Sequence, residues 1–167
     1  MATFNTPASA IEVRLALEED SRWIFSWRND PVTREMSHTH NPISWEDHRV
    51  WFDEALNNPA RCLLMCSNAQ RRVAVTRFDL LTHEALVSIN LDPDLRGQGL
   101  GKVSLEAAIA YFNALHVKSY DLLAEIKRHN LPSRRVFEAC EFILEREDQA
   151  TAYYRRLTRD RADRTGF

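Results

Sequence analysis

The chain has 167 residues, of which 44% are hydrophobic and 28% are charged, and its formal net charge is −2 at pH 7. This length predicts one domain that buries about two-thirds of its unfolded surface. The small charge argues against nucleic acid as an electrostatically attracted partner. No apolar run approaches the roughly 20 residues of a membrane-spanning helix, so we expect no membrane contact and no secretory signal. The three cysteines form no CxxC pair, which fits a reducing cytoplasm.

The first part of the chain predicts one strand and two helices. Residues 11–15 (IEVRL) alternate as a strand does. A helix is expected over residues 18–29, because acidic residues in its first turn suit the helix dipole. Residues 32–42 are polar and predict an irregular segment. Residues 44–47 (SWED) then have the form of a capping box, which opens a helix that ends near residue 57.

The second part alternates between strands and helices. It predicts strands at 62–67, 72–81 and 85–91, a helix at 103–112, a strand at 120–126, a helix at 130–140, and strands at 142–146 and 152–157. The order β-α-α-β-β-β-α-β-α-β-β is that of a mixed α/β domain. We expect this domain to cover residues 11–158, between loose tails at 1–10 and 159–167.

A glycine-rich turn lies between the strand that ends at Leu91 and the following helix. Unpaired N–H groups and the positive end of the helix dipole at such a helix start favour an anion. Glycines let the backbone approach that anion without a Cβ atom in the way. The spacing GxGxG excludes the dinucleotide fingerprint, and Gly97 is one residue too close to Gly101-Lys102 for a nucleoside-triphosphate loop. Another phosphate-bearing ligand is therefore predicted.

Two motifs resemble those of a known family. Residues 96–101 (RGQGLG) resemble the R/Q-x-x-G-x-G/A loop of the GNAT N-acetyltransferases, which binds the pyrophosphate of acetyl-CoA. Residues 130–142 are similar to the family segment N-x-x-S-x-x-x-Y-E-K-x-G-F, and the predicted element order also matches the GNAT fold. The resemblance covers residues 11–158 and implies an enzyme that uses acetyl-CoA as co-substrate and no metal.

The resemblance also implies where acetyl-CoA binds. The pantetheine arm of the cofactor would lie between two parallel strands that part, here residues 89–91 and 120–126. Backbone N–H groups of the glycine loop and the charge of Arg96 would hold the pyrophosphate. Asn130 would form a hydrogen bond with the pantetheine region, and its alternative interpretation is a plain helix N-cap. The implied cofactor-binding residues are Ile89, Leu91, Arg96, Gly97, Gln98, Gly99, Leu100, Gly101, Lys102, Asn130, Ser133 and Phe137.

The catalytic residues are harder to assign. Glu125 lies at a strand end where some family members carry a general base, and a carboxylate beside the thioester arm suits that task. A solvated strand-end acid is its alternative, and Glu84 is a weaker candidate for the base. The family tyrosine that protonates the leaving thiolate is matched by Phe137, which has no proton to give. Tyr153, Tyr154 or a water molecule would have to take its place.

The N-terminal half resembles, in its W-R-N … H-x-x-W-F pattern, the subgroup that acetylates amino-sugar nucleotides. The substrate-binding residues that this implies are Trp27, Arg28, Asn29, Arg34 and His48. The alternatives are that the tryptophans pack two helices onto the sheet and that Arg28 and Asn29 cap a helix. The H-x-H pair at His38 and His40 lacks a third ligand, so no metal site is predicted.

The predicted function is transfer of an acetyl group to a primary amine of a small molecule, with a nucleotide-linked amino sugar as one candidate acceptor. Attack would be direct, in a ternary complex, because no cysteine is placed as an acyl carrier. The alternatives are a protein N-terminal or polyamine acetyltransferase and, from another class, a weakly active acyl-CoA-binding sensor, which the loss of the tyrosine at Phe137 motivates. An apolar face on the last hairpin would permit a homodimer.

Overall fold

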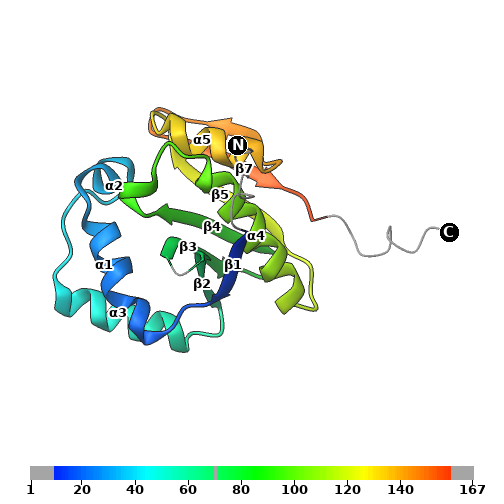
Figure 1. Cartoon of the computed structure of the whole chain (residues 1–167). Coiled ribbons are helices and arrows are strands. Elements are labelled where there is room, and N and C mark those ends of the chain that lie inside the picture. The colour runs from blue at the N-terminus through cyan, green and yellow to red at the C-terminus, as the bar shows by residue number, and fades with distance from the viewer. Residues whose placement is uncertain (1–9, 70, 159–167) are drawn as a thin grey trace, which may run out of the picture.

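A seven-stranded sheet in the order β1-β2-β3-β4-β5-β7-β6 runs through the computed structural model of the chain (Figure 1). The structure describes residues 10–69 and 71–158, so the predicted tails lie outside the described residues except for Ala10. Neighbouring strands are antiparallel, apart from the parallel pair β4 and β5. This sheet, with its helices, confirms the predicted mixed α/β fold.

The elements follow the predicted order. The strands are β1 (Ile11–Leu15), β2 (Arg61–Asn68), β3 (Arg71–Leu80), β4 (Glu84–Leu91), β5 (Asp121–Lys127), β6 (Ile143–Glu147) and β7 (Thr151–Arg156). The helices are α1 (Ser21–Asn29), α2 (Pro31–Met36), α3 (Trp45–Asn57), α4 (Leu100–Leu115) and α5 (Leu131–Ala139), with 3-10 turns η1 (Glu18–Asp20) and η2 (Pro93–Leu95). No helix within these described ranges is both long and apolar enough to cross a membrane.

Helix α2 stands where the sequence predicted an irregular segment, so that prediction was wrong in part. Asp30 is its N-cap and accepts a hydrogen bond from the N–H of Thr33, and Pro31 occupies the first helical position. The helix has only 6 residues, too few for an apolar period to show. The helix expected from residue 18 begins with η1, and α4 begins three residues before its predicted start.

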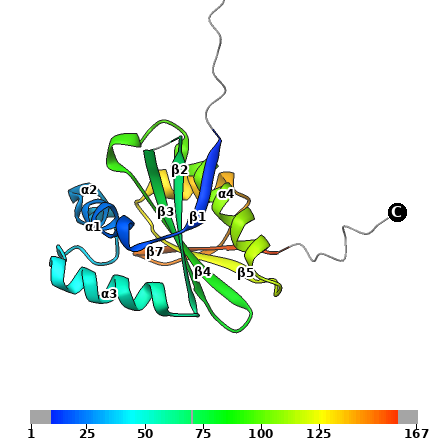
Figure 2. The ribbon, with the colours of Figure 1, turned by 60° about the horizontal axis from the view of Figure 1, so that its bottom comes forward.

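Apolar side chains cover both faces of the sheet. The larger cluster lies against α4 and α5, where the rings of Phe78 and Phe112 stack with centroids 4.2 Å apart. The smaller cluster lies under α1 and α3 and contains Trp27, Phe52 and Met65. Figure 2 shows α1, α2 and α3 on one side of the strands and α4 on the other. We call the side that carries α1 the α1 face.

All three cysteines are buried and unpaired. Cys62, Cys66 and Cys140 belong to the larger cluster, as expected of small hydrophobic residues. Burial raises the pKa of each thiol to about 11. Among the described residues, no group of three or more His, Cys, Asp or Glu side chains is placed to hold a metal ion.

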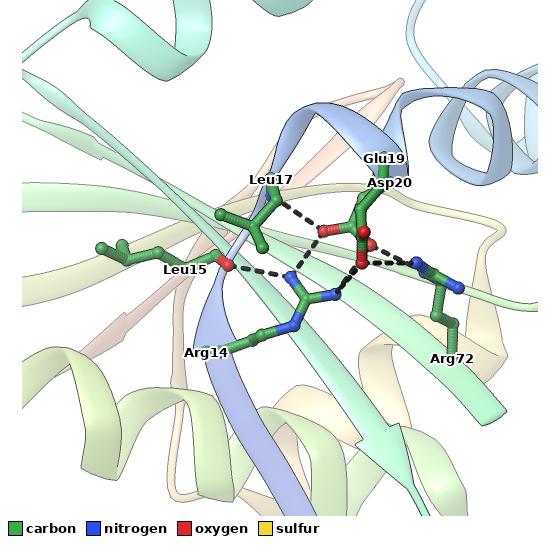
Figure 3. Close-up of polar contacts among 6 residues, drawn as sticks. All are labelled: Arg14, Leu15, Leu17, Glu19, Asp20 and Arg72. Atoms are coloured by element: carbon green, nitrogen blue, oxygen red, sulfur yellow. Dashed lines mark hydrogen bonds and ion pairs between the residues drawn. The ribbon is translucent and has the colours of Figure 1, made fainter. Parts of the chain in front are cut away.

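A buried carboxylate joins the start of α1 to two strands (Figure 3). The side chain of Asp20 is fully buried and accepts hydrogen bonds from Arg14 Nη1 at 2.6 Å and Arg72 Nε at 2.7 Å. It also accepts the N–H of Leu17 at 2.8 Å. Burial by itself raises the pKa of Asp20, but these hydrogen bonds outweigh it and lower the pKa below its ordinary value. Asp20 thus fastens β1, η1 and β3 together.

Candidate active site

The parallel strands β4 and β5 part in the middle of the sheet. Their pairing runs through Glu84↔Asp121, Ala85↔Leu122 and Leu86↔Leu123 and ends there, although both strands continue. Residues 87–91 and 124–127 therefore have no ladder partner across the gap. Buried backbone groups need hydrogen-bond partners, so the edges of this gap, Ile89 and Leu91 included, are suited to an extended ligand.

The glycine loop opens α4 beside this gap. Gly97 and Gly99 have φ angles of 74° and 76°, in the left-handed region where glycine is favoured. Gly99 is the N-cap and supplies no side-chain cap, so the first N–H groups of the 16-residue helix are left for another acceptor. A Cβ atom on either glycine would meet nothing within 4 Å. The loop thus presents backbone donors to open space, as an anion site requires.

Gly101 has a different role from the other two glycines. A Cβ atom there would lie 3.0 Å from Val136 Cγ2, so this glycine lets α4 and α5 pack closely. The sequence pattern explained all three glycines by the close approach of an anion to the backbone. For Gly101 the structure adds helix packing as a reason.

Replacing Gly99 by alanine should weaken acetyl-CoA binding about tenfold, because an L-residue in the left-handed conformation costs about 1–2 kcal/mol and the loop would relax out of shape. Titration calorimetry measures the affinity. Gly101→Ala is the matched control, since its effect should fall on thermal stability and be relieved by adding Val136→Ala. Equal affinities for Gly99→Ala and the unmodified chain would contradict the proposed anion site.

Arg96 is already engaged by other side chains. Its Nη2 donates to Asp30 Oδ2 at 2.6 Å and to Thr33 Oγ1 at 2.7 Å. Burial raises the pKa of Asp30, but the bonds from Arg96 and the Thr33 N–H outweigh this and lower it. Arg96 Nη2 therefore ties the start of α2 to the glycine loop, and contact of the Arg96 side chain with a pyrophosphate stays a prediction. Lys102 is exposed on α4, 3.7 Å from Glu106 Oε1.

The three predicted cofactor-binding residues of α5 have structural roles. Asn130 is the N-cap, and its Oδ1 accepts the N–H of Ser133 at 3.2 Å, as its alternative interpretation proposed. Phe137 is only 2% exposed and packs edge-on against Phe142 with centroids 4.9 Å apart. Contacts of these residues with the cofactor stay predictions.

The two residues predicted to be catalytic lie side by side. Glu125 and Tyr153 are directly opposite each other in the β5–β7 ladder, on the α1 face. Glu125 is exposed and lies just beyond the last β4–β5 pair. Tyr153 Oη donates to Asp148 Oδ2 at 3.0 Å. Glu84 instead accepts a hydrogen bond from Arg155 at 2.8 Å, at the paired end of the strands, which leaves Glu125 as the better candidate for the base.

Two predicted substrate residues belong to the core instead. Trp27 is 3% exposed and His48 is 1% exposed. His48 Nε2 lies 2.9 Å from the carbonyl oxygen of Ser21, and its ring packs between aromatic side chains of α1 and α3. Burial lowers the pKa of His48. Both side chains pack helices onto the sheet, as the alternative interpretation of the tryptophans had it, and contact with the acceptor stays a prediction.

The other three predicted substrate residues hold the segment between α2 and α3. Asn29 bonds both backbone groups of Ile43, with its Oδ1 accepting at 3.0 Å and its Nδ2 donating at 2.9 Å. Arg28 Nη2 donates to the carbonyl oxygen of Thr39 at 3.0 Å, and Arg34 Nη1 donates to that of His40 at 3.3 Å. These contacts build the wall of the α1 face next to the gap.

Polar residues that the sequence analysis missed complete this wall. Arg77 and Ser88 are opposite each other in the β3–β4 ladder, and Thr33 Oγ1 donates to Asn90 Oδ1 at 3.5 Å. Lys127 Nζ, at the end of β5, donates to the carbonyl oxygen of Glu35 at 2.9 Å and lies 2.6 Å from His40 Nε2. Strand alternation was a usable signal for Arg77, Ser88 and Lys127, because their neighbours in sequence face the larger cluster.

A pocket of about 860 Å³ lies elsewhere, between α1 and the turn that precedes the glycine loop. Its walls include Trp23, Asp30, Arg71, Asp92 and Asp94. Neither Glu125 nor Tyr153 lines it, so its size alone does not make it the reaction site. The gap between β4 and β5 combines open backbone groups, an anion site and a candidate base, and it is the stronger candidate.

The family model described as an acetyltransferase (GNAT) domain matches residues 11–143 of the chain. Comparison with curated protein sequences gives no match. Solved structures resemble the fold closely. Spermidine N-acetyltransferase from Vibrio cholerae, solved with CoA and spermine, has a TM-score of 0.78 at 15% identity, over 89% of this chain and 95% of that one.

Two further N-acetyltransferase structures share the fold. The ribosomal L7/L12 α-N-protein acetyltransferase RimL, in complex with CoA, has a TM-score of 0.76 at 18% identity, over 90% of this chain and 96% of that one. The N-acetyltransferase PseH from Campylobacter jejuni has a TM-score of 0.68 at 16% identity, over 90% and 99% of the two chains. At these low sequence identities, the similarity shows a shared fold and does not identify the substrate.

Proposed function

The chain belongs to the GNAT family of acetyltransferases, which use acetyl-CoA as co-substrate, and we propose that it moves the acetyl group to a primary amine of a small molecule. The observation that carries this proposal is the open gap between β4 and β5 beside the uncapped start of α4. The gap suits the extended arm of acetyl-CoA, and the N–H groups of residues 98–101 suit its pyrophosphate. The acceptor would approach from the α1 face, where Glu125 is exposed.

Direct attack is the mechanism that the residues support. The neutral amine attacks the thioester carbonyl carbon, a C–N bond forms, and Glu125 takes the proton that the nitrogen gives up. The C–S bond then breaks. A thiol with a pKa of about 8.5 is a tolerable leaving group as thiolate, and Tyr153, opposite Glu125 in the β5–β7 ladder, carries the hydroxyl that we assign to protonating it.

A covalent acyl-enzyme is disfavoured by the cysteines. Each of the three is buried, and burial raises the pKa of each to about 11, so the nucleophilic thiolate is scarce at neutral pH. Transfer within a ternary complex needs no such intermediate.

A nucleotide-linked amino sugar stays the acceptor that the sequence pattern favours. Of the residues that carried this pattern, Arg28, Asn29 and Arg34 lie beside the gap, whereas Trp27 and His48 are in the core. The support for an amino-sugar nucleotide therefore comes from Arg28, Asn29 and Arg34, the polar residues of the pattern. Protein N-termini and polyamines are the alternatives, since RimL and spermidine acetyltransferase share the fold.

The proposal is tested by measuring CoA release with a thiol reagent while a panel of primary amines is offered with acetyl-CoA. The panel should include amino sugars, their nucleotide-linked forms, an N-terminal peptide and spermidine. We expect acceptor-dependent thiol release with at least one small-molecule amine. Tight acetyl-CoA binding without acceptor-dependent release by any amine would favour the sensor alternative, and release with the peptide alone would favour the protein N-terminal acetyltransferase.

A further inference from the structure

Three arginine side chains gather on the α1 face beside the gap. Arg28 lies in the last turn of α1, Arg34 in the last turn of α2, and Arg77 in the middle of β3. Arg77 is opposite Ser88, an exposed residue of β4 two positions beyond the last β4–β5 pair. The pKa of Arg28 is lowered first by burial and then by the positive charges of Arg34 and Arg77, so the three guanidinium groups act on one another.

Carboxylates do not neutralise the first two of these arginines. Arg28 and Arg34 donate to backbone carbonyl oxygens, and within residues 10–69 and 71–158 neither forms an ion pair. Arg28 Nη1 is buried and has no hydrogen-bond partner among the described residues. A buried, charged N–H without an acceptor is costly. An anionic group held beside Arg28 would supply an acceptor for this guanidinium group.

The third arginine, Arg77, shares its counter-ion Asp79 with another arginine. Asp79 Oδ2 lies 3.0 Å from Arg77 Nε, yet this nitrogen is buried and makes no well-directed hydrogen bond. The same carboxylate accepts a hydrogen bond from Arg61 Nε at 2.6 Å. One negative charge thus serves two guanidinium groups, and Lys127 adds a further positive charge on this face.

We propose that Arg28, Arg34 and Arg77 bind an anionic group, a carboxylate or a phosphate, carried by the amine acceptor. Guanidinium groups match the planar pairs of oxygens that both anions present. The anion would sit over β3 and the amine would reach toward the gap and Glu125. This rests on the proposed function, because it names the acceptor chemistry of that same site. Polyamines, which carry only positive charges, would be repelled.

The first test compares matched acceptors by their kcat/KM for thiol release. Alanine and alaninamide differ in the carboxylate, and glucosamine 1-phosphate and glucosamine differ in the phosphate. We expect the charged member of one pair to be preferred about tenfold or more, as a charge-assisted hydrogen bond allows. The pair that shows the preference identifies the anion. Equal or better use of both neutral members, or of spermidine, would overturn the proposal.

The second test asks whether the arginines carry the preference. Arg77→Gln should raise KM for the charged acceptor about tenfold and leave kcat and the neutral acceptor little changed. Arg61→Gln is the matched control, because it disturbs the same Asp79 carboxylate and should keep the preference. A preference that survives Arg77→Gln, or that Arg61→Gln removes equally, would overturn the assignment.

A binding measurement separates this proposal from the proposed function. If no amine releases thiol although acetyl-CoA binds, the proposed function fails, and the arginine site is tested by titrating alanine and glucosamine 1-phosphate into protein saturated with CoA. Saturation keeps the anions away from the glycine loop. Binding that Arg77→Gln weakens about tenfold and Arg61→Gln does not would support the site. Absence of binding, or binding indifferent to Arg77, would overturn it.

Discussion

Asp20→Ala should lower the free energy of unfolding by about 3 kcal/mol, the scale of loss when one partner of a buried ion pair is removed. The side chain of Asp20 is fully buried, whereas those of Arg14 and Arg72 are 39% and 22% exposed, so the two arginines regain some water and the loss stays at the lower end of that scale. Urea unfolding followed by circular dichroism measures it.

Glu19→Ala is the matched control, because Glu19 pairs with the same two arginines but its side chain is 65% exposed. Its loss should be below about 1 kcal/mol. The pH dependence gives a second check. The pKa of Asp20 is lowered by folding, so its contribution is present above the unfolded value, 3.8 in a model compound, and is lost as the pH falls below it. Asp20→Asn should flatten the stability curve in that acidic range. Equal losses for Glu19→Ala and Asp20→Ala would refute the role of burial.

Glu125→Gln should lower kcat by about 100-fold or more, the usual contribution of a general base, while acetyl-CoA affinity and thermal stability stay unchanged. The stability should hold because Glu125 is exposed and keeps its size in glutamine. Steady-state thiol release gives kcat, and calorimetry gives the affinity.

Glu84→Gln is the matched control for a carboxylate in the neighbouring strand. Glu84 is bonded to Arg155, so its replacement should affect stability more than kcat. If kcat of Glu125→Gln stays within about threefold of the unmodified chain, the proton is taken elsewhere, through water or another group.

The glycine loop and the order of the elements could be predicted because both depend on residues close together in the sequence. Spacing alone distinguished the loop from two nucleotide motifs, and the predicted bounds of all seven strands lie within two residues of the observed ones. Helix α2 was not predicted, because its sequence signals, an Asp N-cap and a following proline, lie within a single short segment.

Partners distant in sequence explain most of what could not be predicted. Arg96 donates to Asp30, 66 residues away, a partner that the local glycine motif does not reveal. His48 showed the spacing of a binding residue, yet the same helical spacing places a residue in the core, and only the packing of α1 on α3 distinguishes the two. Arg77 was missed because its neighbours on the α1 face come from α1 and α2, far from β3 in the chain.

Burial of the cysteine thiols should protect the protein from disulfide formation with CoA, the product of the reaction. Each turnover releases CoA, a free thiol that air oxidises to its disulfide, and an exposed protein thiolate attacks such a disulfide, forms a mixed disulfide and releases one CoA thiolate. With each cysteine pKa at about 11, about one thiol in ten thousand is ionised at pH 7. Cys140 Sγ lies only 3.6 Å from the Lys102 carbonyl oxygen at the start of α4, but it is buried. Oxidised CoA should therefore leave the chain unmodified, and the enzyme should keep its activity without added reductant.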